Sequence, residues 1–118
     1  MFLSDVLTIT KACTISAHPD LEREVRCGAA ADLMSDVLRY DLTHGLLVSG
    51  LANPQVVRTA EMADVTAILM VRGKTPPPET LELAEQVGIP ILGTEVTMFE
   101  ACGLLHSAGL CAPRRREG

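Results

Sequence analysis

The chain has 118 residues, a net charge of −5, 47% hydrophobic residues and 3% aromatic residues. A chain of this length buries one core, so we expect a single domain. The acidic balance argues against a nucleic-acid-binding surface, which needs clustered Lys and Arg to displace counterions from phosphates. The chain has no Trp, one Tyr and two Phe, so its core should be aliphatic.

The hydropathy pattern contains no candidate membrane span. The longest uncharged stretch, residues 42–57, includes His44 and Asn53 and falls short of the roughly 20 apolar residues that a span requires. The start of the chain is not basic and reaches Asp5 at once, so it does not resemble a secretory signal. We therefore expect a cytoplasmic protein with no membrane partner.

The cysteines and histidines do not form a metal-binding pattern. No CxxC pair is present, and the histidines are scattered along the chain, so the spacing of a zinc site is missing. We expect no metal or cofactor, and we expect the cysteines to be reduced, buried thiols. These cysteines are Cys13, Cys27, Cys102 and Cys111.

The N-terminal third carries the weakest local signals. Its pattern predicts a short helix at residues 4–7, with Ser and Asp at its start, and strands at 13–17 and 25–30. A His-Pro-Asp turn at 18–20 should connect those strands, and a helix should follow at 32–40.

Three short apolar runs follow, at residues 46–50, 67–71 and 89–93. Each is bounded by turn residues and is too short for a helix, so each is predicted to be a buried strand. The segments between them have helical periodicity. This alternation predicts an α/β fold, with one mostly parallel sheet between two layers of helices.

The connecting helices have clear boundary signals. The first should begin at Asn53 and Pro54, because Asn caps free N–H groups and the φ of Pro suits a first turn. The second should begin within the proline run at 76–78 and end at Gly88. Their predicted buried stripes are Val56, Val57, Ala60 and Ala63 in the first helix and Leu81, Ala84 and Val87 in the second.

The last helix should begin at Thr97, which forms a capping box with Glu100, and end at Gly109. We therefore place the single domain at residues 1–110 and a flexible, solvated tail at 111–118, which includes three consecutive arginines at 114–116. The predicted buried stripe of this helix consists of Ala101, Leu104, Leu105 and Ala108.

The segment Gly73-Lys74-Thr75 resembles the end of a Walker loop, GxxxxGK[ST]. That loop needs a glycine five positions before Gly73, where this chain has Ile68. Pro76 also favours an extended Thr75 and removes backbone donors at the start of the helix. The segment is therefore a strand-to-helix turn.

Polar residues nevertheless follow three predicted parallel strands, where open α/β sheets place their ligand crevices. Cations, hydroxyls and glycine amides at this edge would suit an anionic or nucleotide-like ligand. The alternative interpretation is that such residues occur at the turns of any α/β protein. The candidate ligand-binding residues are Ser49, Gly50, Arg72, Gly73, Lys74, Thr94 and Glu95.

The remaining polar residues and the Met and Phe side chains have structural explanations. No Ser or Cys lies on a GxSxG-type turn, so no catalytic residue is predicted. Asp32, Ser35 and Asp36 are interpreted as helix-capping residues. We expect core packing for Met62, Met70, Met98 and Phe99.

Several segments resemble the DRTGG domain, which is related to the N-terminal domain of HPr kinase/phosphorylase. They are AADLMSDVLRY, GLLVSG and the pattern P-x-x-E-x-L-x-L-A before GIPIL, and the similarity runs from about Val25 to Leu110. The resemblance implies an α/β domain with a regulatory or ligand-sensing role, often at a dimer interface, and with no catalytic role.

The chain departs from the pattern that gives the family its name. Residues 51–54 are Leu-Ala-Asn-Pro where an Asp-Arg pair would follow the strand, and residues 71–73 are Val-Arg-Gly where Thr-Gly-Gly would stand. Gly73 alone is retained.

Together, these observations predict a non-catalytic regulatory or ligand-sensing module that acts as a homo-oligomer, with a dimer favoured. A nucleotide or a small phosphorylated metabolite is its expected ligand. The alternative is an accessory subunit that docks on a larger metabolic or redox enzyme complex and binds no small molecule; it predicts an exposed apolar patch.

Overall fold

A computed structural model of the chain describes residues 1–17 and 19–116. Its centre is a five-stranded sheet in the order β1-β6-β5-β4-β2. The strands β2, β4, β5 and β6 run parallel, and β1 is antiparallel to β6. Their bounds are β1 Cys13–Thr14, β2 Cys27–Ala30, β4 Gly45–Ser49, β5 Ala67–Met70 and β6 Ile91–Gly93.

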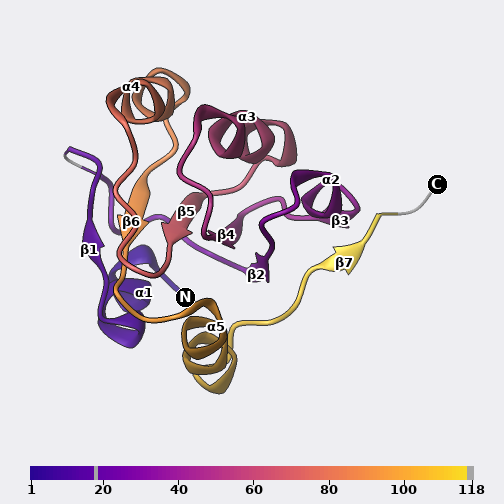
Figure 1. The fold of residues 1–118 in the computed structure, drawn as a ribbon. Helices are drawn as coiled ribbons and strands as arrows, with labels where there is room; N and C mark the ends of the chain where they lie inside the picture. Colours follow the sequence, from indigo (N-terminus) through magenta and orange to yellow (C-terminus); the bar gives the residue numbers. More distant parts are fainter. Residues whose placement is uncertain (18, 117–118) are drawn as a thin grey trace.

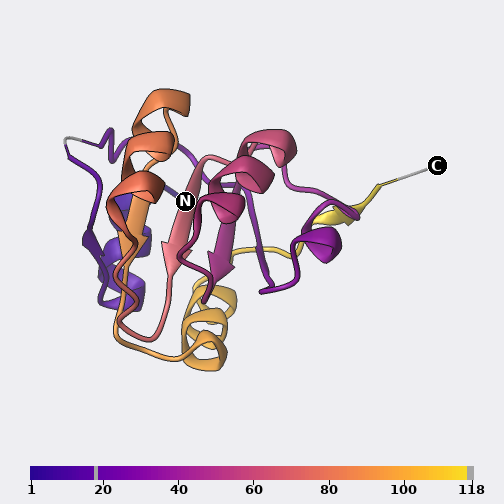
Figure 2. The ribbon, with the colours of Figure 1, turned by 45° about the horizontal axis from the view of Figure 1, so that its top comes forward.

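Helices cover both faces of the sheet (Figures 1 and 2). One face packs against α2, α3 and α4, and the other packs against α1 and α5. The predicted α/β fold with a mostly parallel sheet between helical layers is confirmed. The helices are α1 Leu3–Thr10, α2 Met34–Val37, α3 Pro54–Ala63, α4 Pro78–Val87 and α5 Met98–Ser107. No helix in the described part of the chain is long and apolar enough to cross a membrane.

The central strands are apolar on both faces, which explains their continuous hydrophobic runs. In β4, Leu47 faces the α2–α4 layer, whereas Leu46 and Val48 face the α1–α5 layer. In β5, Ile68 faces the α2–α4 layer and Leu69 faces the α1–α5 layer. Each fully buried aliphatic side chain of this size contributes about 1.5–3 kcal/mol of transfer free energy, so these strands anchor the fold.

The boundary predictions for the three long connecting helices are largely correct. Thr97 accepts a hydrogen bond from the Glu100 amide at 3.2 Å, and Gly88 adopts a left-handed φ of 76° at the end of α4. Helix α3 does begin at Pro54, but the Asn53 side chain makes no capping hydrogen bond. The predicted stripe of α3 is buried, whereas only Ala84 of the α4 stripe is fully buried and its other members are half-buried.

The N-terminal elements differ from the prediction. The first helix is longer, and the expected strand at 13–17 shrinks to β1. It ends there because the amides of Ile15 and Ser16 both donate to the Ile91 carbonyl, at 2.9 and 3.1 Å, which breaks the regular ladder. The expected helix at 32–40 is only α2, because Tyr40–Asp41 forms a strand, β3. The predicted turn at 18–20 includes His18, which lies outside the described residues.

Over residues 111–116 the C-terminal segment is paired, which differs from the expected flexible tail at 111–118, whose last two residues lie outside the described part of the chain. Arg114–Arg115 forms β7, which is antiparallel to β3 in a separate two-stranded sheet beside α2 (Figure 1). The Arg116 amide donates to the Arg39 carbonyl at 3.0 Å, and Arg116 Nε donates to the Tyr40 carbonyl at 3.0 Å. Backbone pairing with β3 therefore orders this segment as far as residue 116.

Two of the residues expected in the core are largely exposed. The exposed fraction is 67% for Met62 and 91% for Phe99, whereas Met70 is buried and Met98 is half-buried. In α5 the sheet-facing residues are Ala101 and Leu105. Phe99 lies two residues before Ala101, about 200° around the helix, and so faces solvent. Leu104 is half-buried and Ala108 is exposed, so the predicted stripe of α5 is only partly correct.

The four cysteines are free thiols, but the expectation that they are buried was wrong. Cys13 and Cys111 are exposed, and Cys27 and Cys102 are partly buried. Partial burial raises the pKa of the Cys27 and Cys102 thiols above their ordinary value.

Candidate functional site

The candidate residues lie at the carboxyl edge of the sheet. Ser49 is opposite Met70, and Met70 is opposite Gly93, so β4, β5 and β6 end in line. The Gly73 amide donates to the Thr94 carbonyl at 2.9 Å, which joins the β5–α4 and β6–α5 loops. The structure thus brings the ends of β4, β5 and β6 and the residues that follow them to one edge, where all seven candidates lie.

Arg72 is the central cation of this edge. Its guanidinium lies against the α-carbon of Gly50, in the space that a side chain there would fill. Nη2 of Arg72 is 3.8 Å from Oδ2 of Asp32, and the two side chains are 49% and 48% exposed. This distance is too long for a hydrogen bond, so the guanidinium donors remain available to a ligand.

Asp32 connects the site to the loop after β2. Its Oδ1 accepts hydrogen bonds from the Gly50 amide at 2.7 Å and from Ser49 Oγ at 3.2 Å. The interpretation of Asp32 as a helix cap was wrong, because Leu33 occupies the N-cap of α2 and no side chain caps that helix. The signal that could have identified Asp32 is its position directly after a parallel strand of the same sheet.

The turn after β5 is left-handed at two successive residues. Arg72 has a φ of 60° and Gly73 a φ of 65°, and a non-glycine residue in this region costs roughly 1–2 kcal/mol. The conformation is held by hydrogen bonds from the Arg72 amide to the Val96 carbonyl and from the Gly73 amide to the Thr94 carbonyl, both at 2.9 Å. The turn therefore fixes the direction in which the Arg72 side chain leaves the backbone.

Several groups expected to meet a ligand are already engaged inside the protein. The Gly50 and Gly73 amides donate to Asp32 and Thr94. Ser49 is buried and donates to Asp32, and the buried Thr94 Oγ1 donates to the Thr10 carbonyl at 2.7 Å. Their present contacts are structural.

Among the candidate residues, the side chains that reach solvent are charged. Arg72, Lys74 and Glu95 are exposed, and the Glu95 carboxylate lies over Gly73. An arginine fork and a lysine can bind phosphate oxygens, and arginine does so through two parallel hydrogen bonds. Asp32 and Glu95 also place carboxylates here, so an anion would compete with them for the cations.

None of the seven candidate residues lines any of three cavities found on the described residues. Within the described residues, no group of three or more His, Cys, Asp or Glu side chains is arranged to hold a metal ion.

Comparison with known proteins gives a structural similarity at low sequence identity. No family profile matches the chain, and no curated protein matches it. A similar solved structure contains the CBS and DRTGG domains of the regulatory region of Clostridium perfringens pyrophosphatase, complexed with its activator diadenosine tetraphosphate. The TM-score is 0.65 at 17% sequence identity, over 87% of this chain.

The two proteins share a fold. This chain spans 45% of the length of the pyrophosphatase chain. At this identity the similarity concerns architecture, and it agrees with the α/β arrangement described above.

Proposed function

We propose that the chain is a non-catalytic regulatory module that senses a nucleotide or a small phosphorylated metabolite at the carboxyl edge of its sheet. The ligand phosphate contacts Arg72 and Lys74, while Ser49, Gly50, Gly73, Thr94 and Glu95 shape the edge around them. The module is a relative of DRTGG domains, acts as a homo-oligomer and resides in the cytoplasm, where its thiols stay reduced.

The observation that carries this proposal is the position of Arg72. Its guanidinium is exposed at the carboxyl edge, held over Gly50 and 3.8 Å from Asp32 without a direct hydrogen bond. The fold shared with a regulatory region whose activator is diadenosine tetraphosphate supports a nucleotide as the ligand. The ligand would displace Asp32 as the nearest anion to Arg72, and the loop after β2 would respond to binding.

Thermal-shift measurements test this function. The purified protein is screened against adenine and guanine nucleotides, diadenosine tetraphosphate, inorganic phosphate and acetyl phosphate. A ligand that binds the folded state at a hundredfold excess over its Kd adds about 2.7 kcal/mol of stability, which raises Tm by several degrees. No shift with any of these compounds would contradict ligand sensing.

Matched variants then locate the site. Arg72→Ala combined with Lys74→Ala should remove the shift, whereas Arg58→Ala, which removes an exposed arginine from α3, should leave it unchanged. A shift that survives the double substitution would place the ligand elsewhere. Light scattering after size exclusion measures the oligomeric state separately.

One observation favours the alternative function, an accessory subunit that docks on a larger enzyme complex. Phe99 is 91% exposed on the outer side of α5, and Leu33, after β2, is 62% exposed. Exposed aromatic side chains often anchor protein interfaces. If docking is the function, Phe99→Ser should abolish association with the partner while Tm stays unchanged and the nucleotide screen stays negative.

A further inference from the structure

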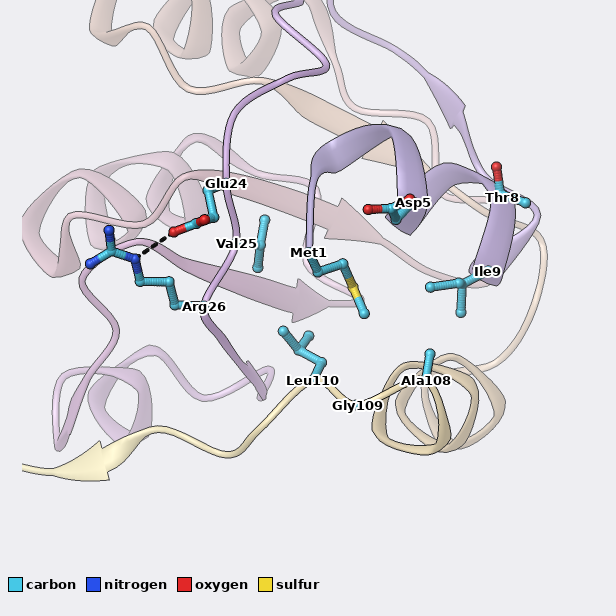
Figure 3. A pocket seen from close by; sticks show the side chains of 10 residues that line it. All are labelled: Met1, Asp5, Thr8, Ile9, Glu24, Val25, Arg26, Ala108, Gly109 and Leu110. Carbon is cyan, nitrogen blue, oxygen red and sulfur yellow. Dashed lines mark hydrogen bonds and ion pairs between the residues drawn. The ribbon is translucent and has the colours of Figure 1, made fainter.

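The chain passes along the outer side of β2 after it leaves α5. Figure 3 shows Gly109 and Leu110 at this point, where the chain turns away from the end of the helix. The Gly28 amide then donates to the Cys111 carbonyl at 2.9 Å, and Cys27 and Cys111 form a parallel β-bridge. Two cysteines that are far apart in the sequence therefore lie opposite each other.

Packing on one face of β2 fixes this register. Leu110 is buried in the cluster between the sheet and the α1–α5 layer, and a Cβ at Gly28 would lie 2.8 Å from its Cδ2 atom. Side chains alternate between the two faces along a strand, so Cys27, which precedes Gly28, lies on the other face. Its side chain packs against the α2–α4 cluster, and its Sγ is 4.0 Å from the Asp41 carbonyl. Residues that are bridged across neighbouring strands point to the same face, which directs Cys111 to the side of Cys27.

The spacing of the two cysteines suits a disulfide. Neighbouring strands lie about 4.7–4.9 Å apart, and disulfides join residues whose α-carbons are about 4.4–6.8 Å apart. Both side chains are free thiols, and each Sγ contacts only a backbone carbonyl, Asp41 for Cys27 and Gly109 for Cys111, at 4.0 and 3.8 Å. Thiols are weak hydrogen-bond donors, so the two side chains can rotate about their Cα–Cβ bonds toward each other while the backbone keeps its pairing.

We propose that Cys27 and Cys111 form a reversible disulfide by exchange with a low-molecular-weight disulfide such as oxidised glutathione. The Cys111 thiolate attacks one sulfur of that disulfide, whose S–S bond breaks and releases one thiolate. The Cys27 thiolate then attacks the Cys111 sulfur of the mixed disulfide and releases the second thiolate. The two protein thiols are oxidised, the external disulfide is reduced to two thiols, and the protons of the cysteines pass to the released thiolates. The new bond fastens residues 111–116 to β2.

The order of the two steps follows from the surroundings of the thiols. Cys111 is exposed and meets the external disulfide first, whereas Cys27 is partly buried. Partial burial, followed by the charges of Asp41 and Cys111, raises the pKa of Cys27, so less of it is thiolate at neutral pH. In a reducing cytoplasm the pair stays open, and it closes when external disulfides accumulate, as transient redox-sensing disulfides do. The proposal is independent of the function proposed for Arg72.

Two chains that keep two thiols each test the proposal. Cys13→Ser with Cys102→Ser retains the proposed pair, whereas Cys13→Ser with Cys27→Ser retains Cys102 and Cys111, which line a common small cavity beside α5. Each dilute, folded chain is mixed with oxidised glutathione, quenched in acid, alkylated and analysed by mass spectrometry. The mixed disulfide at Cys111 should convert to the intramolecular disulfide at least about tenfold faster in the first chain than in the second. Equal rates, or a mixed disulfide that persists in the first chain, would overturn the proposal.

The unsubstituted chain supplies the second measurement, which does not depend on how the variants fold. Peptide mapping after oxidation should identify the bond between Cys27 and Cys111 as the main disulfide. The oxidised chain should keep the amide spectrum of a folded protein, its Tm should rise by several degrees because the bond closes a long loop, and dithiothreitol should reverse the change. A main disulfide that involves Cys13, Cys102 or a second copy of the chain, a bond that forms only in urea, or a lower Tm after oxidation would each contradict the assignment.

Discussion

The guanidinium of Arg72 occupies the space beside the α-carbon of Gly50 that a Cβ would otherwise take. The two residues follow neighbouring parallel strands, and their approach places a cation at the carboxyl edge between two loops. Position 50 has no left-handed φ, so the close approach of Arg72, and not the backbone conformation, favours glycine there. Loop packing therefore sets the orientation of the main candidate ligand-binding side chain.

Replacement of Gly50 by Ala should displace the Arg72 side chain without unfolding the protein. The colliding atoms belong to the flexible end of Arg72, so we expect a loss of stability below about 1 kcal/mol. The Nε–H resonance of Arg72 should shift, and any thermal shift with nucleotides should shrink. Gly103→Ala is the control, because a Cβ there meets no atom within 4 Å and alanine stabilises a helix by about 0.5–1 kcal/mol. An unmoved Arg72 resonance in Gly50→Ala would contradict the described packing.

Removal of the Asp32 carboxylate should destabilise the carboxyl edge. Asp32→Ala leaves the Gly50 amide and the buried Ser49 hydroxyl without their acceptor, at an expected cost of about 1–2 kcal/mol. Asp32→Asn retains one acceptor oxygen and should cost less. Urea denaturation measures both, and equal stability of the two variants would mean that these hydrogen bonds are not stabilising.

Thr94→Val should cost about 1–3 kcal/mol of unfolding free energy. The buried Thr94 Oγ1 donates to the Thr10 carbonyl at 2.7 Å and accepts from the Val96 amide at 3.3 Å, so valine leaves both partners unsatisfied. Thr14→Val at an exposed position is the comparison and should stay within about 0.5 kcal/mol of the parent. Chemical denaturation that ranks the two variants equally would rule out the internal role of Thr94.

Docking of the C-terminal segment should weaken in acid. Hydrogen bonds from Thr43 and, to a smaller extent, the charges of Arg116 and Arg114 lower the pKa of Asp41 below its ordinary 3.8. Only the part of this shift that comes from Arg116 and Arg114 depends on the paired segment; through it, ionised Asp41 favours the paired state above its ordinary pKa, and this contribution is lost as the pH falls through the folded-state pKa. Hydrogen-exchange protection of the Arg116 amide should fall accordingly.

Asp41→Asn should remove this pH dependence, whereas Glu61→Gln, on α3, should retain it. Protection that is constant with pH in the parent chain would contradict a role for Asp41 in holding the segment.

The sequence predicted the elements whose signals are local. Strands β4, β5 and β6 are apolar on both faces, so their apolar runs could be recognised as strands without knowing which strands lie beside them. Thr97 and Gly88 indicated a helix start and a helix end through their capping chemistry. Phe99 and Met62 were assigned to the core from residue type alone. Their exposure depends on which helix face the sheet covers, and that is decided by tertiary packing.

The position of the candidate residues at the carboxyl edge could be predicted from the strand pattern, but their contacts could not. Strand ends located Arg72 and Thr94, because parallel strands bring their carboxyl ends to one edge. Asp32 was missed because its partners Ser49 and Gly50 are 17 and 18 residues away in the sequence. An Asp before a predicted helix is also typical of a helix cap, so the sequence favoured that interpretation. The pairing of β7 with β3 was missed for a similar reason, since a Pro-Arg-rich segment resembles a solvated tail until its partner strand is known.

The C-terminal segment also shields one margin of the main sheet. Strand β2 is an edge strand of the five-stranded sheet. On its outer side the Gly28 amide donates to the Cys111 carbonyl at 2.9 Å, and Cys27 and Cys111 form a parallel β-bridge. An uncovered outer strand is a template for pairing with other chains. A chain cut after Leu110 should therefore be prone to aggregate, and the rate of turbidity growth relative to the intact protein would measure how far those last residues protect its solubility.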